Sequence, residues 1–159
     1  MLLSQRFINP LITIIFLDSC AFDPYYPEDS ASMELYQLCE QGELVLHIAH
    51  STQKEIEHPN TPSWVKQQAN MSISTYKFQL IEEEIRRKDE ILFILSGNGN
   101  PDRVRNDAEH VFEASKYGSY FVTTDARILK KQAELYSLCG VVILKPTEIL
   151  KIIREYKAT

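Results

Sequence analysis

The sequence contains few of the residues that mark specialised structural classes. Its 159 residues include Gly 5, Pro 7 and Cys 3. Cys20, Cys39 and Cys139 are odd in number and far apart, without the paired spacing of a zinc site or a disulfide framework. We therefore expect reduced thiols. The chain is long enough to bury roughly 68–70% of its unfolded surface, so its core needs neither a metal nor a disulfide.

Positive charge is not in excess. The formal net charge is −5 at pH 7, which argues against a general nucleic-acid coat. It does not exclude a nucleic-acid enzyme whose basic residues are concentrated locally. Five residues are candidates for such phosphate contacts and are equally typical of a solvated helix surface: Arg103, Arg105, Arg127, Lys130 and Lys131.

No apolar run has the length of a membrane span. The run at 10–17 is too short to cross a bilayer, and no A-x-A-like cleavage site follows it. Its β-branched residues favour a buried parallel strand. We expect a cytoplasmic protein without a membrane segment, forming a single domain over 1–159 with a loose extension at 1–9.

Apolar runs alternate with helical patterns along the chain. Strands are expected at 12–17, 44–48, 120–123 and 141–144. Helices are expected from Ser30 to Gly42, at 51–57, from 61 onwards, at 80–95, between the loop 96–101 and Gly118, at 127–137 and at 147–156. The segment 72–79 suits either helix or strand. This alternation predicts an α/β fold with a mostly parallel sheet and helices on both faces.

Acidic residues follow the predicted strands at one edge of the sheet. Asp18 and Asp125 lie just past strands 12–17 and 120–123, and Glu55 begins a helix beyond strand 44–48. Asp107 is in the helix before strand 120–123, on or beside its core-facing side. In open α/β sheets, ligands bind in the crevice beyond the carboxyl ends of the strands. The four carboxylates are therefore candidates for one common site.

Four carboxylates in one crevice repel one another and raise each other's pKa values. A hard divalent cation relieves this repulsion; Mg²⁺ takes oxygen ligands at about 2.0–2.1 Å and keeps several waters. Two such ions roughly 3.5–4 Å apart serve an in-line attack of water on a phosphodiester. The hydroxyl of Thr123 or Thr124 is placed to orient a carboxylate or a metal-bound water.

Each acid also has a purely structural interpretation. Glu55 is the fourth member of a capping box that begins at Thr52, and Asp125 is a candidate N-cap for the following helix. Asp18 fits a turn, and Asp107 has Arg103 four residues before it. One such explanation suffices for one residue, but it does not account for the common placement of all four.

Other reactive residues give weaker patterns. His47, His50 and His58 lack the spacing of an H-E-x-x-H metal motif, and no base is apparent for Cys20. His110 lies one turn after Asp107 and faces either the crevice or the solvent.

Taken in order, these segments resemble the PIN-domain family of metal-dependent nucleases. The resemblance extends from strand 12–17 to the final helix and depends on the order and spacing of five short pieces: LDSCAF at 17–22, KEI at 54–56, NDA at 106–108, EA at 113–114 and FVTTD at 121–125. One position differs, because family members often have Asn where this chain has Cys20.

Membership would imply a three-layer α/β/α sandwich with a mostly parallel sheet of four or five strands. It would make Asp18, Glu55, Asp107 and Asp125 the catalytic, metal-binding acids and Thr123 their supporting hydroxyl. The implied activity is hydrolysis of RNA phosphodiester bonds by a nuclease that uses Mg²⁺ or Mn²⁺. The implied partners are an RNA substrate, a second copy of the chain in a homodimer and, if the protein is a toxin, an antitoxin protein.

Three alternatives remain open at this point. The first is a catalytically inactive PIN-fold module that binds or regulates. The second is an aspartyl-phosphate enzyme with Asp18 as nucleophile, although Cys20 stands where a second Asp is expected. The third is a response-regulator-like domain, for which Lys145 and Pro146 supply the Lys-Pro pair but no acid adjoins Asp18.

Overall fold

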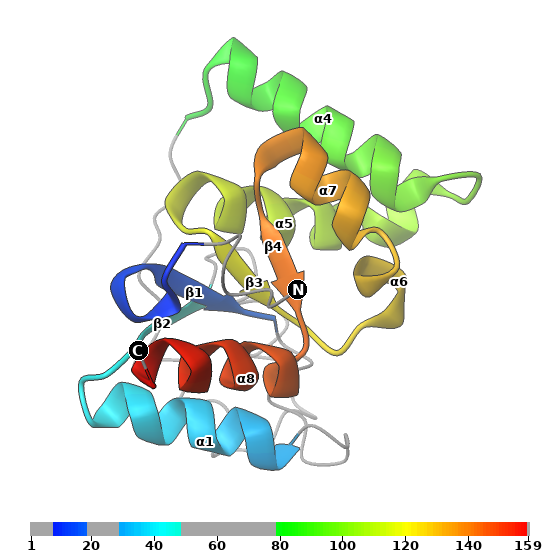
Figure 1. Cartoon of the computed structure of the whole chain (residues 1–159). Helices are drawn as coiled ribbons and strands as arrows, with labels where there is room; N and C mark the ends of the chain where they lie inside the picture. Colours follow the sequence, from blue (N-terminus) through cyan, green and yellow to red (C-terminus); the bar gives the residue numbers. More distant parts are fainter. Residues whose placement is uncertain (1–7, 19–28, 49–78, 159) are drawn as a thin grey trace, which may run out of the picture.

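The computed structural model describes residues 8–18, 29–48 and 79–158. The helices expected at 51–57 and from 61 onwards, and the ambiguous segment up to 78, lie outside these ranges. The described parts form a four-stranded sheet with helices on both faces (Figure 1).

The sheet is parallel throughout. Its strands are β1 (Ile14–Leu17), β2 (Val45–Ile48), β3 (Tyr120–Val122) and β4 (Val142–Leu144), in the order β2-β1-β3-β4. Leu17 is level with Val122, and Val122 is level with Leu144, so three strands end together. The predicted α/β fold with a parallel sheet is therefore confirmed.

The helices form one layer on each side of the sheet. Helices α1 (Asp29–Glu40) and α8 (Pro146–Lys157) cover one face, and α5 (Arg105–Tyr117) and α7 (Gln132–Cys139) cover the other (Figure 1). Helix α4 (Glu82–Ser96) packs on α5 and α7. Three shorter helices complete the described chain: the 3₁₀ helices η2 (Pro10–Ile12) and η5 (Pro101–Val104), and α6 (Ala126–Leu129). This is the three-layer α/β/α sandwich.

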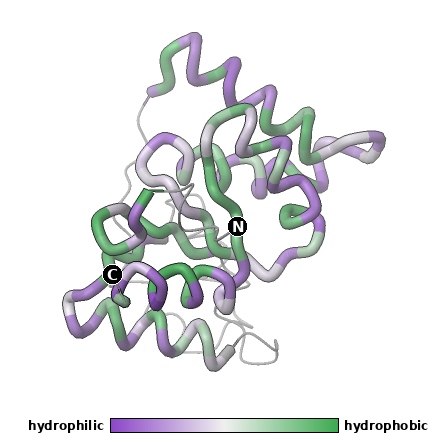
Figure 2. The backbone as a smooth tube through the Cα atoms, viewed as in Figure 1, coloured by the Kyte–Doolittle hydropathy of each residue, from purple (hydrophilic) through white to green (hydrophobic). Residues whose placement is uncertain are grey.

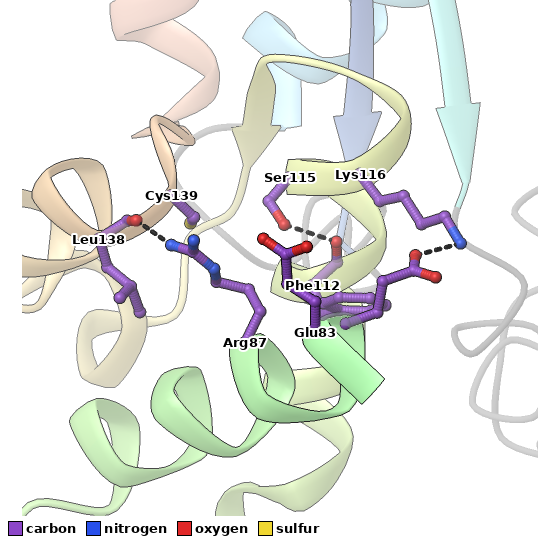
Figure 3. Close-up of a pocket in the computed structure, with 8 residues that line it drawn as sticks. Glu83, Arg87, Phe112, Ser115, Lys116, Leu138 and Cys139 are labelled. Atoms are coloured by element: carbon purple, nitrogen blue, oxygen red, sulfur yellow. Dashed lines mark hydrogen bonds and ion pairs between the residues drawn. The ribbon is translucent and has the colours of Figure 1, made fainter. Parts of the chain in front are cut away.

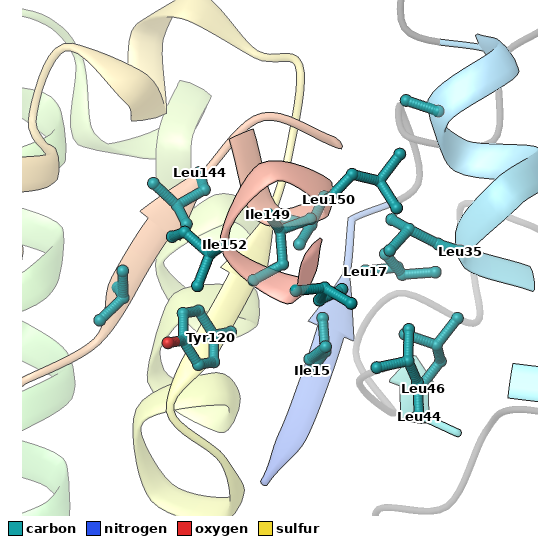
Figure 4. Packing of buried hydrophobic residues seen from close by; sticks show 14 of the residues in the cluster. Ile15, Leu17, Leu35, Leu44, Leu46, Tyr120, Leu144, Ile149, Leu150 and Ile152 are labelled. Atoms are coloured by element: carbon teal, nitrogen blue, oxygen red, sulfur yellow. The ribbon is translucent and has the colours of Figure 1, made fainter. Parts of the chain in front are cut away.

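Alternation along the strands divides the core between the two faces. Ile15 and Leu17 of β1 point to the side of α1 and α8, whereas Phe16 points to the side of α5 and α7. Successive strand residues point to opposite faces, so a continuous apolar run fills both sides of the sheet. Figure 4 shows Ile15 and Leu17 packed with Leu35 of α1 and Ile149 of α8. In Figure 2 the strands are largely hydrophobic, whereas the helices alternate between hydrophobic and hydrophilic residues.

Helix α8 shows how the local sequence determines this packing. Pro146 occupies the first helical position, where its missing N–H costs nothing, and the Glu148 side chain accepts a hydrogen bond from the Lys145 N–H at 2.9 Å. Ile149, Ile152 and Ile153 recur at helical spacing and are fully buried. Burying each such side chain stabilises the fold by about 1.5–3 kcal/mol.

Two predicted boundaries are wrong. The strand expected at 12–17 begins only at Ile14, because Asn9 caps η2 by accepting the Leu11 N–H at 2.9 Å, and Ile12 is 79% exposed. The helix expected at 127–137 is interrupted after Leu129. The interruption lets α6 stay at the end of β3 while α7 packs against β4 and α4.

The residues before β1 contact the sheet. The Ile8 carbonyl accepts a hydrogen bond from the Tyr120 hydroxyl, so residues 8 and 9 of the expected loose extension are held to the described fold. Within the described ranges, no helix has both the length and the apolar character needed to cross a bilayer. Cys39 and Cys139 are free thiols, and Cys20 lies outside the described residues.

Candidate functional site

The carboxyl edge of the sheet brings Asp18 and Thr123 side by side. The β ladder continues one residue past the strands, since the Asp18 N–H donates to the Val122 carbonyl at 2.9 Å and the Thr123 N–H donates to the Leu144 carbonyl at 3.0 Å. Parallel strands that end in register present their next residues at one place. The Asp18 and Thr123 side chains are both buried there.

The Thr123 hydroxyl links two of the predicted acids. It donates a hydrogen bond to Asp18 Oδ2 at 2.8 Å and accepts one from the Asp125 N–H at 3.0 Å. A hydroxyl suits this position because it donates and accepts at once. The position of the Asp18 carboxylate is thereby fixed relative to the chain at Asp125.

His110 is on the other side of Asp18. Its imidazole is completely buried, and Nδ1 lies 3.4 Å from Asp18 Oδ1. Of the two orientations left open by the sequence, the structure has the one that faces the crevice. Asp107, His110 and the fully buried Ala114 lie in one row of α5, at spacings of three and four residues. This helical spacing from Asp107 is the signal in the sequence that predicts His110 on the side of α5 that faces the crevice.

Asp107 extends from the first turn of α5 towards the same edge. Burial and, to a smaller extent, the Asp18 and Asp125 carboxylates raise the pKa of this carboxyl to about 6, while Arg127 and His110 act in the opposite direction. The contributions of Asp18 and Asp125 require these acids to lie close to Asp107. Three of the four predicted acids are thus neighbours in space.

Asp125 is the N-cap that its position in the sequence suggested, and it also lies beside the other acids. Its side chain caps α6 by accepting the Arg127 N–H at 2.9 Å, and it faces the other acids. The Arg127 guanidinium also bonds to it twice, from Nε to Oδ1 at 3.2 Å and from Nη2 to Oδ2 at 2.8 Å.

The same guanidinium reaches Asp107. Arg127 Nη2 lies 3.5 Å from Asp107 Oδ2. Among the described residues, Asp107 therefore pairs with Arg127 and not with Arg103, the partner that helical spacing suggested. One arginine from α6 neutralises acids of two different elements.

Glu55, the fourth predicted acid, lies outside the described residues. The structure thus brings Asp18, Asp107, Asp125 and Thr123 together and leaves the position of Glu55 as a prediction. It adds His110 and Arg127, which sequence reasoning did not assign to the site.

The arrangement of these oxygens bears on whether they can hold a metal. Within the described ranges, no three His, Cys, Asp or Glu side chains are already grouped around a position for an ion. Asp18 directs one oxygen to Thr123 and the other to His110, and Asp107 and Asp125 share Arg127. The donors are carboxylate oxygens, which suit Mg²⁺ or Mn²⁺ better than softer metals.

Of the other predicted histidines, His50 and His58 lie outside the described residues, and His47 packs in the fold. His47 is half-buried and meets the Phe16 ring edge-on, with ring centroids 6.0 Å apart. Two of the proposed phosphate-binding residues have acidic partners on the surface, Arg105 with Asp102 at 2.9 Å and Lys131 with Glu134 at 3.5 Å.

A separate pocket of about 400 Å³ lies between α4, α5 and α7 (Figure 3). Lys116 pairs there with Glu84, and Arg87 donates to the Leu138 carbonyl. Ser115 and Lys116 are at the opposite end of α5 from Asp107, roughly 12 Å along its axis. The pocket is therefore distinct from the cluster of acids.

Comparison with known proteins gives no assignment: no protein-family model matches the chain, and neither does any curated protein sequence. The functional conclusion therefore depends on the geometry at the carboxyl edge of the sheet.

Proposed function

We propose that the chain is a PIN-like endoribonuclease that depends on Mg²⁺ or Mn²⁺ and hydrolyses phosphodiester bonds of RNA. The single observation that carries this proposal is the convergence of Asp18, Asp107 and Asp125 at the carboxyl edge of a parallel sheet, where burial and the two neighbouring carboxylates raise the pKa of Asp107 to about 6. Structural acids are normally matched by cations, whereas these outnumber the arginine between them.

Each side chain has a definite task in the proposed mechanism. Asp107 and Asp125, with Asp18 and the predicted Glu55, would hold the divalent cation, which would supply the positive charge that hydrolysis of a phosphodiester needs. Thr123 orients Asp18 through the 2.8 Å hydrogen bond. His110 packs on the far side of that carboxylate, so Asp18 is held from two directions.

RNA as substrate, an antitoxin as partner and a homodimer follow from the family resemblance and remain predictions. A second candidate function has a specific observation in its favour. Because Arg127 already bonds to Asp125 and lies near Asp107, the acids have a protein counter-ion and are compatible with an inactive binding module. Metal binding distinguishes the two candidates.

The decisive experiment is titration calorimetry with Mn²⁺ on the wild type, Asp125→Asn and Asp89→Asn. Asn retains the N-cap of α6 but removes the charge, so the fold should persist while Mn²⁺ binding is lost. Asp89→Asn is the matched control on the exposed side of α4 and should bind as the wild type does. A wild type that binds no Mn²⁺ would favour the inactive module, and cleavage assays on single-stranded RNA would then be expected to fail.

A further inference from the structure

Arg127 is the feature of the site that the proposed nuclease chemistry does not require. Its guanidinium makes two hydrogen bonds to Asp125, at 3.2 and 2.8 Å, and its Nη2 lies 3.5 Å from Asp107. The side chain is 58% exposed, so its position is determined by these carboxylates and not by burial.

A single nitrogen atom therefore occupies a position between two carboxylate oxygens from different elements. Oδ2 of Asp125 is on the N-cap of α6, and Oδ2 of Asp107 is on the first turn of α5. Asp18 also acts on this cation, since Asp125, Asp107 and Asp18 all raise the pKa of Arg127. All three acids thus stabilise positive charge at the position of this guanidinium.

A divalent cation held jointly by Asp107 and Asp125 would lie between their two Oδ2 atoms, where Nη2 of Arg127 now lies at 3.5 and 2.8 Å from them. Mg²⁺ and Mn²⁺ require carboxylate oxygens at about 2 Å, so an ion that bridges these two oxygens would come into contact with the guanidinium. Two positive charges at this separation also repel each other. The guanidinium and the metal therefore cannot occupy the position between these two carboxylates at the same time.

We propose that Arg127 is an internal counter-ion that competes with the divalent metal for Asp107 and Asp125, so that metal binding requires its guanidinium to swing away. This inference rests on the proposed metal site and adds how that site is regulated. In the metal-free state the arginine relieves repulsion among the acids and holds the crevice together. Arg127 then sets the metal concentration at which the site is loaded.

The movement needs no rearrangement of the fold. Arg127 is the second residue of α6, and its backbone N–H is bonded to Asp125 independently of the guanidinium. The exposed side chain has rotatable bonds enough to turn into solvent while α6 stays capped. Release of the guanidinium exchanges one cation for another at the carboxylates.

The test is Mn²⁺ titration calorimetry on the wild type, Arg127→Gln, Arg127→Lys and Arg105→Gln. Arg127→Gln removes the competing charge, so its Mn²⁺ affinity should exceed that of the wild type by about tenfold, equivalent to about 1.4 kcal/mol. Arg127→Lys retains one charge without the two-pronged geometry and should lie between them. Arg105→Gln is the matched control, because Arg105 pairs with Asp102. This variant should bind Mn²⁺ with the affinity of the wild type.

Melting temperatures measured in parallel provide a readout that does not depend on cleavage. Without metal, Arg127→Gln should melt below the wild type, and Mn²⁺ should raise its melting temperature by more than it raises that of the wild type. Equal or weaker Mn²⁺ affinity in both Arg127 variants, with the wild type binding, overturns this inference and leaves the proposed nuclease intact. Absence of binding in the wild type and in the variants overturns both.

Discussion

The two ends of helix α5 carry charge in different ways. At its first turn, Asp107 lies with Asp18 and Asp125, and Arg127 pairs with Asp107 and Asp125. At its last turn, Lys116 pairs with Glu84 in the pocket beside α4 (Figure 3). Among the described residues, the first end gathers three acids around one arginine and the buried His110, whereas the second pairs one cation with one acid.

The pKa values record this difference. Burial and neighbouring acids raise the pKa of Asp107 to about 6, whereas the hydrogen bond from Lys116 lowers the pKa of Glu84. A fold stabilised only by its charges would resemble the second end throughout. Partly buried carboxylates that repel one another are typical of functional sites, where a bound ligand relieves the repulsion.

The largest difference between the two ends should be in catalysis. If the acids form a metal site, Asp18→Asn and Asp125→Asn each remove a charge from it and should lower cleavage of a fluorescent single-stranded RNA by about 100-fold or more, with Mn²⁺ or Mg²⁺ present. Asn preserves an acceptor for Thr123 at position 18 and a cap at position 125.

Glu84→Gln is the corresponding change at the other end of α5. It breaks a partly buried ion pair far from the clustered acids and should leave the cleavage rate unchanged. Wild-type activity in the Asp18→Asn/Asp125→Asn double variant would contradict the nuclease assignment and make the two ends functionally equivalent.

The dependence of stability on pH should have opposite signs at the two ends. The folded state raises the pKa of Asp107 from 3.8 to about 6 and so disfavours its ionised form. The cost is absent while the carboxyl is protonated in both states, develops as the pH rises from about 4, and is complete above about 7. Relative to Asp107→Asn, the metal-free wild type should lose on the order of 2–3 kcal/mol of unfolding free energy across this range.

Glu84 should behave in the opposite way. Its pKa is lowered in the folded state, so its stabilisation is present near neutral pH and is lost as the pH falls through the acid range. Urea denaturation in EDTA from about pH 3 to about pH 8, on the wild type, Asp107→Asn and Glu84→Gln, measures both slopes. Parallel pH profiles for the wild type and Asp107→Asn would show that the acids do not repel one another.

Much of this comparison was accessible from the sequence. Apolar runs such as 14–17 identified the strands, and their parallel arrangement predicted that Asp18 and Asp125, which follow two of these strands, would be neighbours at one edge of the sheet. These inferences succeed because strand periodicity and chain connectivity are local properties that constrain where a parallel sheet ends.

The remaining features depend on contacts between distant segments. Helical spacing predicted an ion pair between Arg103 and Asp107. In the structure, Asp107 pairs with Arg127, which follows β3 in the sequence. The break after Leu129 is equally invisible, because both Ile128 and Leu135 are buried and fit an uninterrupted helical pattern. His110 was underrated for the same reason: its partner Asp18 is far away in sequence.

The smallest expected effect concerns the hydroxyl that holds the acidic end together. Thr123→Val keeps the shape of the buried side chain but removes the donor to Asp18 and the acceptor for the Asp125 N–H. Leaving these buried groups without that partner should lower the unfolding free energy by about 1–2 kcal/mol in urea denaturation.

Two further variants sharpen the result. Thr123→Ser retains the hydroxyl and loses one methyl group, so it should lose less stability than Thr123→Val and retain Mn²⁺ binding. Ser115→Ala at the other end of α5 removes a hydroxyl bonded to the carbonyl of Phe112 at 2.7 Å and should cost less than Thr123→Val. If Val and Ser at position 123 proved equally destabilising, the methyl group and not the hydroxyl would be the feature that matters, and Asp18 would owe its position to the packing around it.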